Sequence, residues 1–270
     1  MARILAVETS GDACSVALLL IDQQGASEVQ YRHRIAPREH THLLLPMIDE
    51  LLVAAGLGVA QLDAIALGCG PGSFTGLRIS AGVVQGLAFA AGLPVVSVSS
   101  LAAIARAALL ARPGSGACRA LVCMDARMGE LYVGAYDCLR APRASRAQDE
   151  CAQAAPRVAV AGAERGPAAT VVPVAPGEAL VAPADWPLPQ WLRPGADHLA
   201  LGSGWAMMAQ IPGAADVPWA ALDTEILPHA ADIAWLGLEA WRRGETLLPH
   251  QVEPVYLREQ VAWRKIEPAR

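Results

Sequence analysis

The first hundred residues alternate short apolar runs with amphipathic stretches. Two apolar runs, at 3–8 and 13–21, flank a polar turn at 9–12, a pattern typical of a β-hairpin. Apolar residues then recur at three- and four-residue spacing over 37–52, which predicts a helix. Similar patterns predict a strand at 64–68, a helix at 77–91, a strand at 94–98 and a helix at 101–111.

The turn-forming sequence Pro-Gly-Ser-Gly at 113–116 is the clearest boundary in the chain. It divides the chain into an N-terminal domain, 1–111, and a C-terminal domain, 112–270. The second half is predicted to contain strands at 120–125 and 131–137, a loop-rich stretch over 140–191 with one or two short strands, helices near 204–210 and at 228–243, and an extended tail at 254–258.

A strand hairpin followed by helices occurs in both halves. This repetition indicates a duplicated α/β fold in which each domain is a mixed sheet flanked by helices, with a cleft between the two lobes. We also expect the last helix and the tail to pack back toward the first domain.

Composition narrows the possible function classes. The 270 residues are 54% hydrophobic, but no apolar run reaches the roughly 18 residues of a membrane-spanning helix, and the N-terminus does not resemble a signal peptide. We therefore expect a cytoplasmic protein without membrane contact. The net charge of −5, with Lys265 as the only lysine, does not build a broad phosphate-binding surface. Any nucleic acid is expected to be held mainly by another protein.

The cysteines are spread without any pair at two-residue spacing, so no zinc ribbon or redox motif is indicated. We expect buried, reduced thiols at Cys14, Cys69, Cys118, Cys123, Cys138 and Cys151.

The most informative segment is a glycine-rich turn between a predicted strand and a predicted helix. It reads Gly70, Pro71, Gly72, Ser73, Phe74, Thr75, Gly76, Leu77, Arg78. Glycines permit close backbone approach, and amides at a helix N-terminus can bind an anion. However, the turn lacks the lysine of a P-loop and the glycine spacing of a dinucleotide site, and Pro71 replaces the first glycine of a nucleophile elbow. Spacing alone leaves open a ligand-binding turn and a tight connection without a ligand.

The whole nine-residue string, 70–78, resembles the signature of the TsaB (YeaZ-type) family, partner subunits of the bacterial threonylcarbamoyladenosine machinery. Further matches are the hairpin at 3–20, the sequences at 38–40 and 44–46, the second-domain opening at 124–132 and the tail at 255–258. The resemblance covers nearly all of the chain except about 140–190.

This resemblance implies an actin-like (RNase H-like) fold. The catalytic relative, TsaD, transfers a threonylcarbamoyl group to N6 of the adenosine beside the tRNA anticodon and binds its metal through two histidines. The matching positions here are Ser100 and Ile104, and serine is a poor metal ligand while isoleucine is none. We therefore predict no metal and no catalytic residue. His40 and His42 offer no replacement, because two-residue spacing points them to different helix faces, and we expect them to be exposed or capping.

A weak nucleotide site is a further possibility that the actin-like resemblance raises. Glu8, Thr9 and Ser10 stand where actin-like ATPases place a phosphate-binding aspartate, and Gly202 and Gly204 form the glycine pair of the second half that could approach an adenine. The alternative is that these residues form only a structural hairpin and turn, with no cofactor bound.

Two helices of the first domain are unusually apolar, which suggests a surface for a partner. The alternative is that they only cover a sheet. The resemblance favours the partner, because TsaB-type proteins pair through helices of this domain. The residues expected at the interface are Leu44, Leu45, Met47, Ile48, Leu51, Gly82, Val83 and Gly86. We expect Asp125, Arg127 and Glu130 to lock a loop and not to act in acid–base chemistry.

These observations lead to one main hypothesis, a non-catalytic subunit that binds a TsaD-type catalytic subunit and a TsaE-type ATPase. It could form a homodimer, and it would meet tRNA only through the complex. The alternatives are a metal-dependent peptidase of the wider glycoprotease family and a weak stand-alone ATPase. The first needs metal ligands that the matching positions lack, and the second needs phosphate-binding acid and lysine chemistry.

Overall fold

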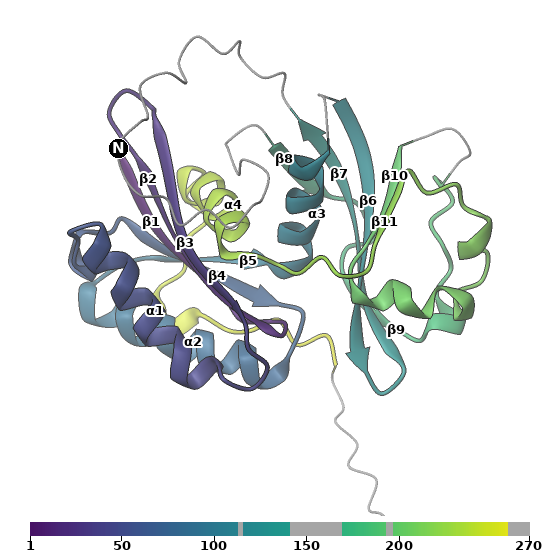
Figure 1. Cartoon of the computed structure of the whole chain (residues 1–270), viewed down its shortest axis with the longest axis horizontal. Coiled ribbons are helices and arrows are strands. Elements are labelled where there is room, and N and C mark those ends of the chain that lie inside the picture. The colour runs from purple at the N-terminus through teal and green to yellow at the C-terminus, as the bar shows by residue number, and fades with distance from the viewer. Residues whose placement is uncertain (113–115, 141–168, 193–196, 259–270) are drawn as a thin grey trace, which may run out of the picture.

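The computed structural model describes residues 1–112, 116–140, 169–192 and 197–258. Its framework is a pair of β-sheets with helices between them and on their outer sides (Figure 1). The first sheet has the strand order β3-β2-β1-β4-β5. Its strands are β1 (Ala2–Glu8), β2 (Ala13–Ile21), β3 (Ser27–Ile35), β4 (Ala64–Gly70) and β5 (Val95–Ser99).

The second sheet repeats the topology of the first. Its order is β11-β10-β6-β7-β8, with β9 also paired to β7. In the first sheet, β1, β2 and β3 pair antiparallel, while β1, β4 and β5 run parallel. In the second sheet, β6, β7 and β8 pair antiparallel, while β6, β10 and β11 run parallel. The duplicated, mixed-sheet α/β fold predicted from the sequence is therefore confirmed. The strands are β6 (Gly116–Arg127), β7 (Glu130–Arg140), β8 (Ala169–Pro173), β9 (Ala179–Val181), β10 (His198–Leu201) and β11 (Ala221–Asp223).

The four α-helices of the described residues divide between the outer and inner layers. Helices α1 (His40–Ala54) and α2 (Phe74–Ala91) cover the outer face of the first sheet. Helix α3 (Ser100–Ala111) follows β5 but packs mainly on β6, β7 and β8, whereas α4 (Ala230–Arg242) follows β11 but packs on β1, β2 and β4. One helix from each half of the chain therefore packs on the sheet of the other half.

Both faces of the first sheet are buried, which explains its continuous apolar runs. In β1, Leu5 and Val7 face α1 and α2, while Ile4 and Ala6 face α4. The second sheet packs on α3 at one face and on a tryptophan-rich layer at the other. That layer and the loops contain the short 3₁₀ helices η1 (Val59–Gln61), η3 (Pro183–Asp185), η4 (Ser203–Gln210), η5 (Ala214–Asp216) and η6 (Pro249–Gln251).

Several predicted elements differ in detail from the observed ones. The sequence analysis missed β3, an edge strand whose polar residues hide the strand pattern. The helix expected near 204–210 is the 3₁₀ helix η4, and it contains a kink at Met207. The strands β8 and β9 are the short strands expected in the loop-rich stretch, and the part of that stretch at 141–168 lies outside the described residues.

Helix α2 is long and apolar enough to cross a membrane by length and composition alone. A core helix passes the same test, and α2 packs Leu77, Ala81 and Val84 against the first sheet. Its apolar character therefore has a structural cause within the fold.

Candidate functional site

The glycine-rich loop 70–78 lies directly against the turn that follows β1. A Cβ atom on Gly76 would come within 2.0 Å of the Thr9 carbonyl oxygen, and one on Gly72 within 2.5 Å of the Ser10 carbonyl oxygen. Such distances are not tolerated, so both positions require glycine. The glycines of this loop are explained by packing within the chain.

Hydrogen bonds fasten the loop to the same turn. The Ser73 amide donates to the Ser10 carbonyl at 2.7 Å, and the Thr9 hydroxyl donates to the Gly76 carbonyl at 2.8 Å. The Ser73 hydroxyl accepts from the Gly76 amide at 3.3 Å and caps α2. The Ser73 and Gly76 amides therefore have hydrogen-bond partners within the chain.

Glu8, at the end of β1, is the central acidic residue of the region. Its Oε1 accepts from the Ser10 amide at 2.5 Å, and its Oε2 accepts from the Ser100 hydroxyl at 2.7 Å. Burial raises the pKa of Glu8, against the lowering effect of the hydrogen bonds from Ser10 and Ser100. An acid that holds metal-bound phosphates must be ionised and accessible. Glu8 is fully buried, and Thr9 and Ser10 beside it are buried too.

The two positions matched to the metal-binding histidines have other roles. The Ser100 hydroxyl is bonded to Glu8, and Ile104 lies in the hydrophobic core between α3 and the second sheet. In the described parts of the chain, no group of three or more histidine, cysteine or acidic residues could hold a metal ion.

His40 does not lie where the sequence analysis placed it. It is buried, with Nε2 3.3 Å from the Ala13 carbonyl oxygen, because the start of α1 packs on the β2 strand. The expectation of an exposed or capping histidine is therefore wrong for His40. His42 is exposed.

The glycine pair of the second half occupies the position equivalent to the loop 70–78. Gly202 and Gly204 follow β10, as the loop 70–78 follows β4. A Cβ on Gly202 would lie 2.5 Å from the Cys123 carbonyl oxygen, and one on Gly204 would lie 2.4 Å from the Cys123 sulfur. These glycines therefore approach the chain's own β6 strand closely.

A cluster of hydroxyls around one carboxylate lies where the two sheets meet, and sequence reasoning missed it. The hydroxyls of Ser99 and Tyr136 both donate to Glu178 Oε1, Tyr136 at 2.5 Å. Burial, together with the charge of Glu178, raises the pKa of Tyr136 well above its usual value. These residues come from β5, β7 and the segment before β9, and no local sequence pattern connects them.

The turn between β6 and β7 is stabilised by contacts of Asp125, Arg127 and Glu130. The Arg127 amide donates to Asp125 Oδ1 at 2.7 Å. Arg258 pairs with Glu130 and donates to the Ala126 carbonyl at 3.2 Å. Each of these side chains stabilises backbone geometry, as expected for a structural turn.

The C-terminal tail crosses from the first half to this turn. The Val255 amide donates to the Cys69 carbonyl at the end of β4, at 2.8 Å. Next to it, the Arg78 guanidinium lies 3.8 Å from the centroid of the Phe74 ring and donates to the Tyr256 hydroxyl at 3.0 Å. Arg78, Phe74 and Tyr256 thus form one exposed cluster, in which the guanidinium lies over the Phe74 ring and Tyr256 comes from the tail.

The predicted partner residues separate into two groups. Leu44, Met47, Ile48 and Leu51 lie in the core under α1, so the expectation that they face a partner is corrected, since α1 needs them to cover the sheet. Leu45 is 51% exposed, Gly82 and Gly86 are exposed, and Val83 is half-buried. Both helices lie side by side on one face of the sheet.

Comparisons with known proteins agree with this architecture. A family model described as "TsaD: tRNA N6-adenosine threonylcarbamoyltransferase" matches residues 30–265. The tRNA threonylcarbamoyladenosine biosynthesis protein TsaB of Escherichia coli K12 is 33% identical over 265 residues, which cover 98% of each chain. The solved structure of YeaZ from Pseudomonas aeruginosa covers 95% of this chain and is itself covered completely, with a TM-score of 0.73 and 36% identity.

A second Pseudomonas aeruginosa structure is described as an uncharacterized protein with similarity to peptidase YEAZ. It covers 96% of this chain, is itself covered completely, and has a TM-score of 0.74 and 37% identity. The loop packed on the first hairpin, the duplicated topology and these full-length matches lead to one conclusion. The chain belongs to the TsaB (YeaZ-type) proteins, within the wider TsaD family.

Proposed function

We propose that the chain is a non-catalytic subunit of the machinery that makes N6-threonylcarbamoyladenosine in tRNA. The observation that carries this proposal is the match, at 33% identity over 98% of both chains, to a relative named for tRNA threonylcarbamoyladenosine biosynthesis. In this role it binds a TsaD-type catalytic subunit and a TsaE-type ATPase in the cytoplasm, uses no cofactor, and meets tRNA only within the complex.

The geometry of the inner region supports a non-catalytic role. Glu8 is buried and bonded to Ser100, and burial favours its neutral form. Ile104 is buried in the hydrophobic core. Glu8 stands at the position of a phosphate-binding acid, and Ser100 and Ile104 stand at the positions of two metal ligands. In this chain all three stabilise the fold.

Exposed apolar residues on α1 and α2 support the partner role. Leu45 is 51%, Val53 70% and Phe89 81% exposed, and a Cβ added to Gly82 or Gly86 would meet nothing within 4 Å. Apolar side chains beside open glycines let another helix approach closely. We assign this patch, Leu45, Val53, Gly82, Gly86 and Phe89, to the catalytic subunit or to a second copy of the chain.

The interface can be tested without disturbing the core. Gly82→Arg and Gly86→Arg place a long charged side chain in open space, and arginine favours a helix by nearly 1 kcal/mol relative to glycine. We expect both variants to fold normally and to lose co-purification with the TsaD-type subunit. Ala209→Arg, on an exposed position of η4, is the matched control and should retain the partner.

Retention of the partner by both glycine variants at wild-type affinity, measured by calorimetry, would rule out this patch as the interface. Sedimentation of the isolated variants gives the state of the homodimer separately. Loss of the dimer with the partner retained would assign the patch to a second copy alone.

The non-catalytic assignment has its own test. Ser100→Ala should leave threonylcarbamoyladenosine formation by the assembled complex nearly intact, because its hydroxyl bonds to the buried Glu8 within the described part of the chain. A loss of more than about tenfold in rate, with the complex still assembled, would show that Ser100 belongs to a catalytic centre. Peptide hydrolysis or ATP turnover by the isolated chain would favour the peptidase or the ATPase instead.

A further inference from the structure

Two cysteines face each other across the β6–β7 hairpin. Cys118 in β6 and Cys138 in β7 are direct partners in the antiparallel register, and both are free thiols. Directly opposed residues point to the same face of a sheet, with Cα atoms about 4.5–5.5 Å apart. That separation falls within the range of about 4.4–6.8 Å found for disulfides.

The two thiols lie in different environments. Cys138 is 1% exposed and lies in the core under α3, whereas Cys118 lies at the margin of that core and is partly exposed. The hydrogen bond from the Cys138 thiol lowers the pKa of Cys118, and the Arg112 guanidinium acts in the same direction, against burial and the Asp197 carboxylate.

The other described cysteines have the opposite character. Burial raises the pKa of Cys14 to about 11 and that of Cys69 to about 12, and it raises the pKa of Cys123 as well. Since the thiolate is the reactive form, these three thiols are protected. Cys118 is the one described cysteine that combines access to solvent, a stabilised thiolate and a second thiol directly opposite on the paired strand.

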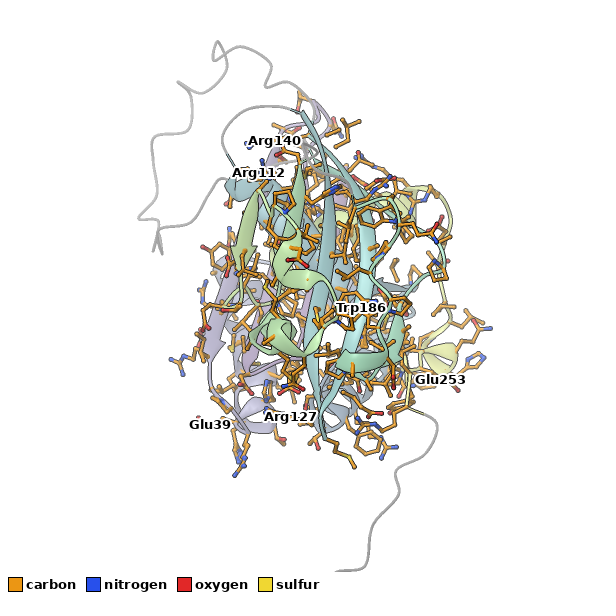
Figure 2. All side chains as sticks on the ribbon, turned by 90° about the vertical axis from the view of Figure 1, so that its right-hand side faces the viewer. Glu39, Arg112, Arg127, Arg140, Trp186 and Glu253 are labelled. Atoms are coloured by element: carbon orange, nitrogen blue, oxygen red, sulfur yellow. The ribbon has the colours of Figure 1, made fainter. Side chains whose placement is uncertain are left out.

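Positive charge gathers at the same end of the hairpin. Arg112 and Arg140 lie together at one end of the second sheet in Figure 2, where Arg140 donates to the Arg112 carbonyl. Arg112 Nη2 donates to Asp197 at 2.9 Å, while its Nη1 is buried without a hydrogen-bond partner in the described part of the chain. A guanidinium near Cys118 stabilises a thiolate and the oxidised sulfur that forms from it.

We propose that Cys118 and Cys138 are a reversible redox pair that a peroxide oxidises to a cross-strand disulfide. The Cys118 thiolate attacks one peroxide oxygen; the O–O bond breaks, and hydroxide leaves and takes up a proton to become water. Cys138 then attacks the resulting sulfenic acid as it gives up its proton, because the hydrogen bond with Cys118 and burial raise the pKa of Cys138 and keep it a thiol until that step. An S–S bond forms, the S–O bond breaks, and the leaving hydroxide takes the Cys138 proton as water. Two thiols and one hydrogen peroxide give one disulfide and two waters.

The product closes the open end of the hairpin, where the chain enters β6 and leaves β7. Cytosolic disulfides of this kind are transient and sense redox conditions, and strained or accessible ones are the reducible ones. A thiol reductant therefore returns the pair to its starting state. This chemistry does not depend on the proposed role in tRNA modification.

The test uses the full-length protein, reduced, treated with hydrogen peroxide, alkylated and digested with trypsin without reductant. Cleavage at arginine gives peptides 107–119 and 128–140 with one cysteine each, and Cys123 falls in the intervening peptide 120–127. We expect a linked peptide joining 107–119 to 128–140, lighter by two hydrogen atoms than the sum of its parts and abolished by dithiothreitol. Cys123→Ser should give the same product.

Single variants separate the two roles. In Cys138→Ser, peroxide should leave Cys118 as a sulfenic acid that dimedone traps, whereas in Cys118→Ser the Cys138 thiol should react at least tenfold more slowly than Cys118 does. Cys151 lies outside the described residues, so the experiment is repeated in Cys151→Ser. A disulfide from Cys118 to any other cysteine, or oxidation of Cys118 beyond the sulfenic acid with Cys138 still alkylated, would overturn the proposal.

Discussion

Arg106 in α3 and Asp232 in α4 form an ion pair from which solvent is excluded. Arg106 Nη1 donates to Asp232 Oδ1 at 2.7 Å, and the two side chains are 1% and 0% exposed. Burial lowers the pKa of Arg106 to about 10, against the effect of Glu239, so the arginine stays charged at neutral pH. Because each helix packs on the sheet of the other half, this pair joins the two halves of the molecule.

Asp232→Ala should therefore destabilise the protein strongly. It leaves the Arg106 charge buried without its carboxylate, a change that costs about 3–5 kcal/mol. Urea unfolding gives the difference. Asp197→Ala removes an exposed ion-pair partner from Arg112 and should cost less than about 1 kcal/mol. Equal losses for the two variants would mean that burial adds nothing to the Arg106–Asp232 pair.

Gly76 and Gly82 lie in the same helix but should respond oppositely to alanine. A Cβ on Gly76 would overlap the Thr9 carbonyl, whereas one on Gly82 meets open space. Gly76→Ala should destabilise the fold by about 1–3 kcal/mol through overpacking, and Gly82→Ala should stabilise it by nearly 1 kcal/mol through helix propensity. Thermal unfolding of both variants measures the difference. A neutral Gly76→Ala would show that the loop does not dock on the first hairpin.

The sequence predicted the elements whose patterns are local. The continuous apolar runs of β1 and β2, split by a polar turn, and the periodic spacing in α1 were sufficient to place them. The strand β3 was not found, because it pairs through its backbone at a sheet edge and needs few apolar side chains.

The site depends on contacts between distant positions, which no local pattern specifies. Glu8 meets Ser100 across 92 positions, and neither that contact nor the burial of Glu8 could be read from the residues beside it. The exposure of residues on α1 and α2 was only partly predicted for a related reason. Periodicity identifies an apolar helix, but it cannot tell that Leu44 enters the core while Leu45, one position on, remains exposed.

Glu8→Gln should change how stability depends on pH. Burial raises the pKa of Glu8 above its ordinary 4.5, so folding takes up a proton between the unfolded and the folded pKa. The stabilising contribution of neutral Glu8 is complete below about pH 4.5 and is lost as the pH rises through the raised, folded-state value. Glutamine is neutral throughout, and it can still accept from Ser10 and donate to Ser100. The variant should therefore gain stability relative to the wild type as the pH rises toward neutral.

Urea unfolding across this pH range measures the gain, and Glu50→Gln, at an exposed position of α1, serves as the control that should follow the wild-type curve. Curves for Glu8→Gln and the wild type that stay parallel would mean that Glu8 is ionised in the folded protein, and its bond with Ser100 would then hold a buried charge.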